Sequence, residues 1–105
     1  NLLQADKRLN AGIYLFNKGK VSLALSTISK AENYFEQAIG KAKEARKEGV
    51  AINEIAMKLM SSSKKHQEVI SVLKEKSPQN FKSGFNLQLL RVDKFAEQAT
   101  ALSLK

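Results

Sequence analysis

The sequence predicts an all-α protein: an elongated, antiparallel up-down four-helix bundle with a short first helix. Three observations support this fold. Apolar residues recur at alternating spacings of three and four, the period of one face of a helix. Breaker residues at Asn17–Lys20, Gly49–Val50 and Ser77–Pro78 divide the chain into four segments. No segment of useful length alternates with a period of two, so we expect no strands.

The first two helices are expected over about residues 2–17 and about residues 20–48. The first carries a short apolar stripe that ends at Phe16. The second gives the strongest pattern, because both seam positions stay apolar over four heptads. It ends where Gly49 follows a basic stretch, which is typical of a helix C-terminus.

The other two helices are expected over about residues 52–76 and about residues 79–103. Ser77 and Pro78 suit an N-cap followed by a proline at the first helical position. Because the connections are short, sequential helices should lie antiparallel. Three glycines fall inside helical patterns, and we expect each to mark a point of close packing: Gly12, Gly40 and Gly84.

Length and composition limit the classes of protein to consider. The chain has 105 residues, a length typical of one domain, which we take as residues 1–105. It has no cysteine, which excludes disulfides and thiolate metal sites. It begins with Asn1 rather than Met, so we interpret it as a processed product or an excised domain. No run approaches the ~18 apolar residues that a membrane span requires.

The only histidine, His66, falls on the apolar seam of the third helix and is the first candidate for a site. A zinc site would need further histidine or cysteine ligands, and a nucleophilic site would need a strained turn and an oxyanion loop. We therefore expect no catalytic residue, no metal and no cofactor. Instead we interpret His66, Ser62 and Ser63 as a structural key, in which the ring bonds to serine hydroxyls or to the backbone of a facing helix. A pH-sensitive packing point is the alternative.

The acidic residues are expected mostly on polar faces. Glu32 and Glu36, one turn apart, should form an outward strip. The net charge of +8 makes lysines the candidates for contact with nucleic acid or an anionic membrane lipid. These candidates surround Pro78 or lie mid-way along the third helix: Lys74, Lys76, Lys82, Lys64 and Lys65. They do not form one continuous track, so a solvated basic surface is the favoured interpretation.

Leucines near the C-terminus exceed what one apolar seam requires: Leu87, Leu90, Leu102 and Leu104. The short first helix should also leave part of the apolar face of the other helices uncovered. Both features favour contact with a partner protein or a homodimer. No small-molecule substrate is indicated.

Two segments resemble known helical families. Residues 19–31, "GKVSLALSTISKA", resemble the middle of a tetratricopeptide repeat, but no ~34-residue period recurs. Residues 5–78, from "ADKRL" through the Gly19-Lys20 turn and "KAENYFEQA" to "KHQEVI" and Pro78, are similar to an uncharacterised all-helical domain of bacterial and archaeal proteins. That resemblance implies an extracytoplasmic location, although a cytoplasmic one stays open, and it implies no activity.

The sequence thus favours a non-enzymatic helical interaction or spacer module of a bacterial envelope or secreted protein. The alternative is a basic helical domain that binds nucleic acid or an anionic membrane surface. An enzyme that uses His66 is the third hypothesis.

Overall fold

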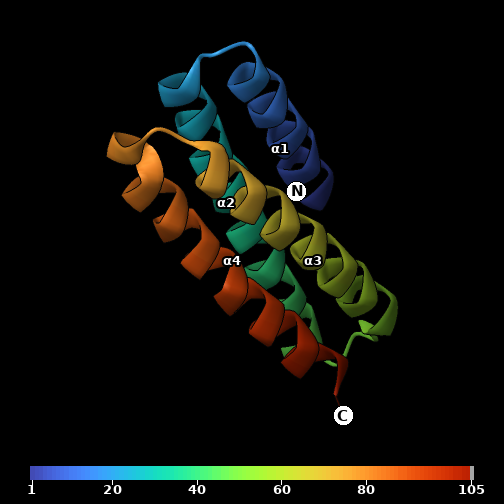
Figure 1. The fold of residues 1–105 in the computed structure, drawn as a ribbon. Helices are drawn as coiled ribbons and strands as arrows, with labels where there is room; N and C mark the ends of the chain where they lie inside the picture. The colour runs from blue at the N-terminus through green and yellow to red at the C-terminus, as the bar shows by residue number, and fades with distance from the viewer. Residues whose placement is uncertain (105) are drawn as a thin grey trace.

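The computed structural model describes residues 1–104, and within them it contains helices and no strand (Figure 1). The predicted all-α bundle with a short first helix is confirmed, and each helix boundary lies within three residues of the expected one. The helices are α1 (Leu2–Asn17), α2 (Val21–Lys47), α3 (Asn53–Lys76) and α4 (Lys82–Ser103), with one 3₁₀ turn, η1 (Gln79–Phe81), before α4.

The bundle is a rod of 46 × 19 × 16 Å. Its length follows from α2, because 27 residues at about 1.5 Å each span about 40 Å. The 16 residues of α1 span only about 24 Å, so α1 covers one half of the rod. The side chain of Asn1 meets Gln37, and the rest of α2 continues beyond α1.

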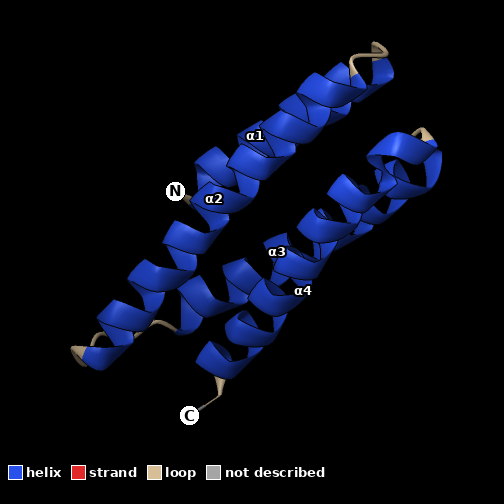
Figure 2. Cartoon of the chain, turned by 90° about the vertical axis from the view of Figure 1, so that its left-hand side faces the viewer, coloured by secondary structure: helices blue, strands red, loops and turns tan. Residues whose placement is uncertain are grey.

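The four helices form two hairpins, α1 with α2 and α3 with α4, which stack on each other (Figure 2). Sequential helices are antiparallel, as expected. Across the stack, α2 packs on α4 and α1 packs on α3, whereas α2 and α3 share few contacts. The connection at residues 48–52 therefore crosses a diagonal of the bundle. The main contacts between the hairpins, α2 with α4 and α1 with α3, consequently join helices that run in the same direction.

Local sequence explains most helix ends. Gly19 and Gly49 have φ of 82° and 84°, the left-handed conformation that glycine adopts without strain after a helix. The expected N-cap at Ser77 is wrong. Its hydroxyl donates to the carbonyl of Lys74 at the end of α3, and Pro78 is extended. The 3₁₀ turn connects Pro78 to α4, so this helix begins three residues later than expected.

Beyond the end of α1 the apolar surface is covered only in part, because Ile55 and Met57 of α3 are 48% and 67% exposed. In that half of the rod α2, α3 and α4 close a three-helix core around Ile39, Ala42, Ala56 and Leu102, all buried. Small residues permit this closure because helix axes approach closely where side chains are short. The expectation that Leu102 is surplus to the core is wrong, because it is 6% exposed and packs in this core.

The glycines inside helices divide into two groups. A Cβ at Gly12 would meet the side chain of Ile28, and one at Gly84 would meet Leu25, so both mark close packing as expected. Gly40 contradicts that expectation, because the space where its Cβ would lie is open.

Candidate functional site

His66 lies at the centre of α3 with no exposed surface, held between two carboxylates from other helices. Its Nδ1 is 2.7 Å from Oε2 of Glu32 on α2, and its Nε2 is 2.9 Å from Oδ1 of Asp6 on α1. The hydroxyl of Ser62 donates to the same Asp6 oxygen at 2.6 Å. We call Asp6, Glu32, Ser62 and His66 the buried polar cluster. It connects three of the four helices.

The predicted serine partners of the histidine ring are wrong. The Ser63 hydroxyl donates to the Met60 carbonyl one turn earlier, and Ser62 bonds Asp6, so neither hydroxyl reaches the ring. Serine side chains are short and lie on the same helix as His66. Carboxylates on the facing helices occupy both ring nitrogens instead.

The expected outward position of Glu32 is wrong as well, because Glu32 is 0% exposed. Glu36 alone lies outside, 3.5 Å from Arg91 of α4. The sequence contained a signal for both carboxylates. Glu32 lies one turn from Ile28 and from Phe35, on the apolar stripe of α2. Asp6 fills the gap between Leu2 and Leu9 in the stripe of α1, where an apolar residue would be regular.

The surroundings of His66 act on its pKa in opposite directions. Burial has the largest single effect and lowers the pKa, because a low-dielectric interior disfavours the charged ring. The hydrogen bond and charge of Glu32, followed by those of Asp6, together outweigh burial and raise the pKa above the ordinary 6.5. Only an imidazolium can donate to both carboxylates at once, since a neutral ring has one N–H.

The cluster is sealed on most sides. The ring of Phe35 meets the imidazole edge-on with centroids 5.2 Å apart. Asp6, with 37% of its side chain exposed, is the one member that reaches solvent. Within residues 1–104, Oε1 of Glu32 is buried without a hydrogen-bond partner. Burial of an unpaired carboxylate oxygen costs free energy. The packing of the three helices, rather than the local conformational preference of Glu32, therefore keeps this side chain inside.

The hydrogen bonds of the cluster link α1, α2 and α3. Both ring nitrogens of His66 are engaged, and Ser62 donates to Asp6 rather than to the ring. A general base needs a free nitrogen within reach of a substrate proton. Among the described residues no group of three or more histidine, cysteine, aspartate or glutamate side chains is arranged to hold a metal ion.

The candidate lysines fall into two groups. Lys74 donates to Oδ1 of Asn86, and Lys82 donates to the carbonyls of Lys74 and Glu75 at the end of α3. These two amines therefore stabilise the α3–α4 turn and are already occupied. The exposed ones are Lys64, Lys65 and Lys76.

Sequence reasoning missed one feature of the basic surface. The α1–α2 turn lies at the same end of the rod as Pro78, and a hollow there is lined by residues of both turns, including Lys20, Pro78 and Phe81. Lys18 and Lys20 thus join Lys76 at this end. We call these three residues the basic end.

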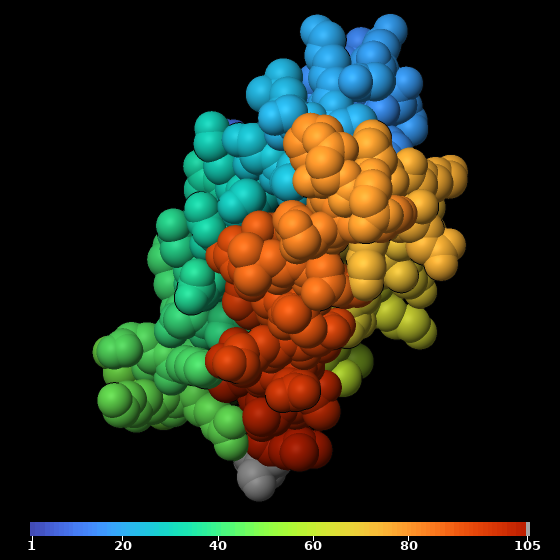
Figure 3. Space-filling model, turned by 60° about the vertical axis from the view of Figure 1, so that its left-hand side comes forward, coloured from blue at the N-terminus to red at the C-terminus, as the bar shows by residue number. Residues whose placement is uncertain are grey.

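The remaining leucines are exposed. Leu87 and Leu90 expose 58% and 57% of their surface, and Leu104 is also exposed. Leu87 lies one turn from Gly84 and from Arg91, both of which contact α2, so it borders the α2–α4 seam. Figure 3 views the side on which α4 (orange to red) runs beside α2 (cyan to green). We call this side the α2/α4 face. Residues that meet or face each other across its seam are Arg91 and Gln98 of α4 and Asn33, Glu36, Lys43 and Lys47 of α2. We include Leu87 and Leu90, which are exposed on α4 three residues apart beside this seam.

Comparison of the chain with models of protein families, with curated proteins and with solved structures found no match. The resemblance of residues 5–78 to a bacterial and archaeal helical domain therefore stays a prediction. None of the helices within residues 1–104 combines the length and the apolar character needed to cross a membrane.

Proposed function

We propose that this protein is a non-enzymatic helical module that binds another protein through its α2/α4 face, as part of a bacterial envelope or secreted protein. The observation that carries the proposal is the pair Leu87 and Leu90, each more than half exposed and one turn apart on α4. Full burial of an exposed leucine on a partner contributes about 1.5–3 kcal/mol. Apolar anchors at i and i+3 are the pattern of helix-in-groove recognition.

The face that carries these leucines is held rigid, which favours a binding role. Arg91 reaches from α4 to α2, where its guanidinium donates to the carbonyl of Ser29 at 3.4 Å and to Oδ1 of Asn33 at 2.8 Å. A surface that is already ordered loses less conformational entropy on binding. The engaged nitrogens of His66 support the non-enzymatic part of the proposal.

Site-specific photo-crosslinking in the native host tests this function. A photoreactive residue at Leu87 or Leu90 should give a discrete adduct with one partner protein. The same residue at Met57, which is 67% exposed but lies on α3, is the matched control. Adducts of equal yield from all three positions, or none from α4, would refute binding through this face.

A second candidate function is favoured by the basic end. Lys20 lines the hollow between the two turns, and Lys18 and Lys76 are exposed in the same turn and at the adjacent end of α3. Their positive charge suits the phosphates of nucleic acid or of anionic lipids. Binding of a DNA duplex or of anionic vesicles, measured at about 50 and about 200 mM salt, tests it. Tight binding that collapses at the higher salt and weakens on Lys20→Gln/Lys76→Gln would favour this candidate over protein contact.

A further inference from the structure

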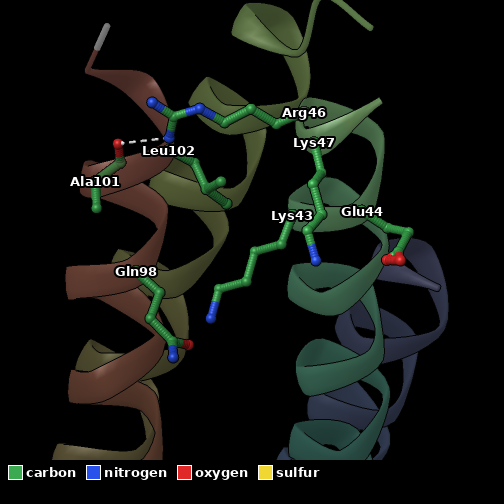
Figure 4. A pocket seen from close by; sticks show the side chains of 7 residues that line it. All are labelled: Lys43, Glu44, Arg46, Lys47, Gln98, Ala101 and Leu102. Carbon is green, nitrogen blue, oxygen red and sulfur yellow. Dashed lines mark hydrogen bonds between the residues drawn. The ribbon is translucent and has the colours of Figure 1, made fainter. Parts of the chain in front are cut away.

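We infer that one half of the α2/α4 face, where α2 and α4 end, is a binding groove for carboxylates, and that the partner contacts it with an acidic segment. This inference rests on the proposed function and adds the chemistry of the partner. The groove encloses about 640 Å³ between the C-terminal half of α2 and the end of α4. Its lining comes from Lys43, Glu44, Arg46, Lys47, Gln98, Ala101 and Leu102 (Figure 4).

Two ammonium groups in the groove lack counter-charges. Lys43 extends from α2 toward Gln98 of α4, and Lys47 runs along α2 at the edge of the same space (Figure 4). Glu44 also belongs to the lining, but its carboxylate points away from α4 (Figure 4). Within residues 1–104, neither lysine forms a hydrogen bond or an ion pair. Because they are four residues apart, both side chains start from one side of α2, about one helical turn from each other. This spacing suits two carboxylates that are also one turn apart.

Arg46 closes the end of the groove instead of offering a third free cation. Its guanidinium donates to the carbonyl of Ala101 at 3.2 Å and to that of Leu104 at 3.0 Å. These contacts fix the C-terminal end of α4 against α2. The groove is therefore a formed feature of the fold, with a neutral amide on one wall and the apolar Leu102 beneath.

Gly40 is an exposed residue that lies beside the groove, although it is not one of its lining residues. It lies between Glu36 and Lys43 on the strip of α2 that faces α4, and nothing lies within 4 Å of its ideal Cβ. Glycine in a helix interior is less favourable than alanine by about 1 kcal/mol. Gly12 and Gly84 are explained by close packing, but Gly40 is not. The backbone of α2 is therefore accessible one turn before Lys43, next to the groove.

The chemistry of the whole face selects an acidic and partly apolar segment. Leu87 and Leu90 occupy one half of α4, and Lys43 and Lys47 border the other half. From Leu87 to Ala101 the helix rises about 21 Å, the length of a partner helix of about 14 residues. A second copy of the chain is a poor occupant, because at +8 per copy it would bring lysines against lysines.

Solution NMR of the ¹⁵N-labelled chain, titrated with glutarate as a soluble dicarboxylate, tests the groove directly. The side-chain amide of Gln98 and the backbone amides of residues 40–47 and 98–102 should shift and saturate. Lys43→Gln/Lys47→Gln should weaken binding by about tenfold, since two exposed ion pairs are lost. Lys41→Gln/Lys58→Gln, with the same charge change at exposed lysines outside the groove, should change it less than about twofold.

Other outcomes would overturn the inference. Shifts spread over all exposed lysines would show simple charge screening, and shifts centred on Pro78 would place the anion site at the basic end. Stronger saturation by inorganic phosphate at the same residues would replace the carboxylate with a phosphate ligand. Equal glutarate affinity of wild type and Gly40→Leu would show that the open space at Gly40 does not contribute to binding.

The two proposals fail separately. Loss of glutarate binding with cross-linking at Leu90 intact would refute the groove and leave the binding face. Specific glutarate binding with no cross-linking at Leu87 or Leu90 would refute the proposed function and leave a site for a small carboxylate.

Discussion

The charge on His66 should make the stability of the bundle fall as pH rises above neutral. Glu32 and Asp6 raise the pKa of His66 above 6.5 in the folded protein, against the effect of burial. In the unfolded chain the ring returns to its ordinary value. Between these two pKa values the folded state holds one proton more than the unfolded state. The free energy of unfolding should therefore decrease with pH over that window, by about 1.4 kcal/mol per pH unit.

The sign follows from the linkage between protonation and folding. The contribution of the cluster is fully present below 6.5, is lost progressively as pH rises, and is gone above the folded pKa. Each unit by which the folded pKa exceeds 6.5 corresponds to about 1.4 kcal/mol of stability. Because His66 is the only histidine, one ring resonance in a proton NMR titration reports its folded pKa without assignment.

Urea unfolding followed by circular dichroism, from about pH 5.5 to about pH 9, measures the slope. His66→Gln is the control, because it keeps hydrogen-bonding capacity but does not titrate. This variant should be less stable by about 1–3 kcal/mol near pH 6 and should lack the slope. Stability of the wild type that is flat or rises between pH 6.5 and the NMR midpoint would refute the assignment of a charged, paired histidine.

Other variants test packing and the cluster through the free energy of unfolding in urea. Gly40→Ala should stabilise by about 0.5–1 kcal/mol and Gly12→Ala should destabilise, because only Gly12 lies against the buried Ile28; equal effects would contradict this packing. Glu32→Ala should cost about 3–5 kcal/mol, since it leaves a buried charge with one partner. Glu32→Leu/His66→Phe should recover most of that loss, and a double variant as unstable as the single one would show that the cluster is more than a paired charge. Leu87→Ser/Leu90→Ser should alter stability by less than about 0.5 kcal/mol, and a larger loss would mean that these leucines support the fold.

The fold was predictable from the sequence because the bundle depends on local patterns. The spacing of apolar residues by three and four, together with the positions of Gly19 and Gly49, predicted the helix boundaries to within a few residues. The start of α4 was missed because Ser77 has two possible partners. Its hydroxyl can cap a following helix or bond to the preceding turn, and only the packing of the α3–α4 turn selects the second.

The candidate sites were harder to predict because they depend on which helices meet. The burial of His66 was predicted from its seam position, but the residues that bind it come from 34 and 60 positions away. A carboxylate is normally assigned to the surface, so Glu32 was placed outside although it interrupts an apolar stripe. The groove beside Gly40 required the pairing of α2 with α4, which sequential neighbours alone do not indicate.

The diagonal connection at residues 48–52 has a consequence for how the chain finds one alignment. Most contacts form inside two local hairpins, which can assemble before they dock. Their docking surfaces are largely apolar, and apolar surfaces tolerate sliding. A slide of one turn would place His66 opposite Glu36 and Leu2, or opposite Ile28 and Asn10, and either shift removes a carboxylate. We therefore expect the buried polar cluster to set the register of the bundle. Only one alignment of the two hairpins pairs His66 with both carboxylates, and every other alignment leaves a buried charge without a partner.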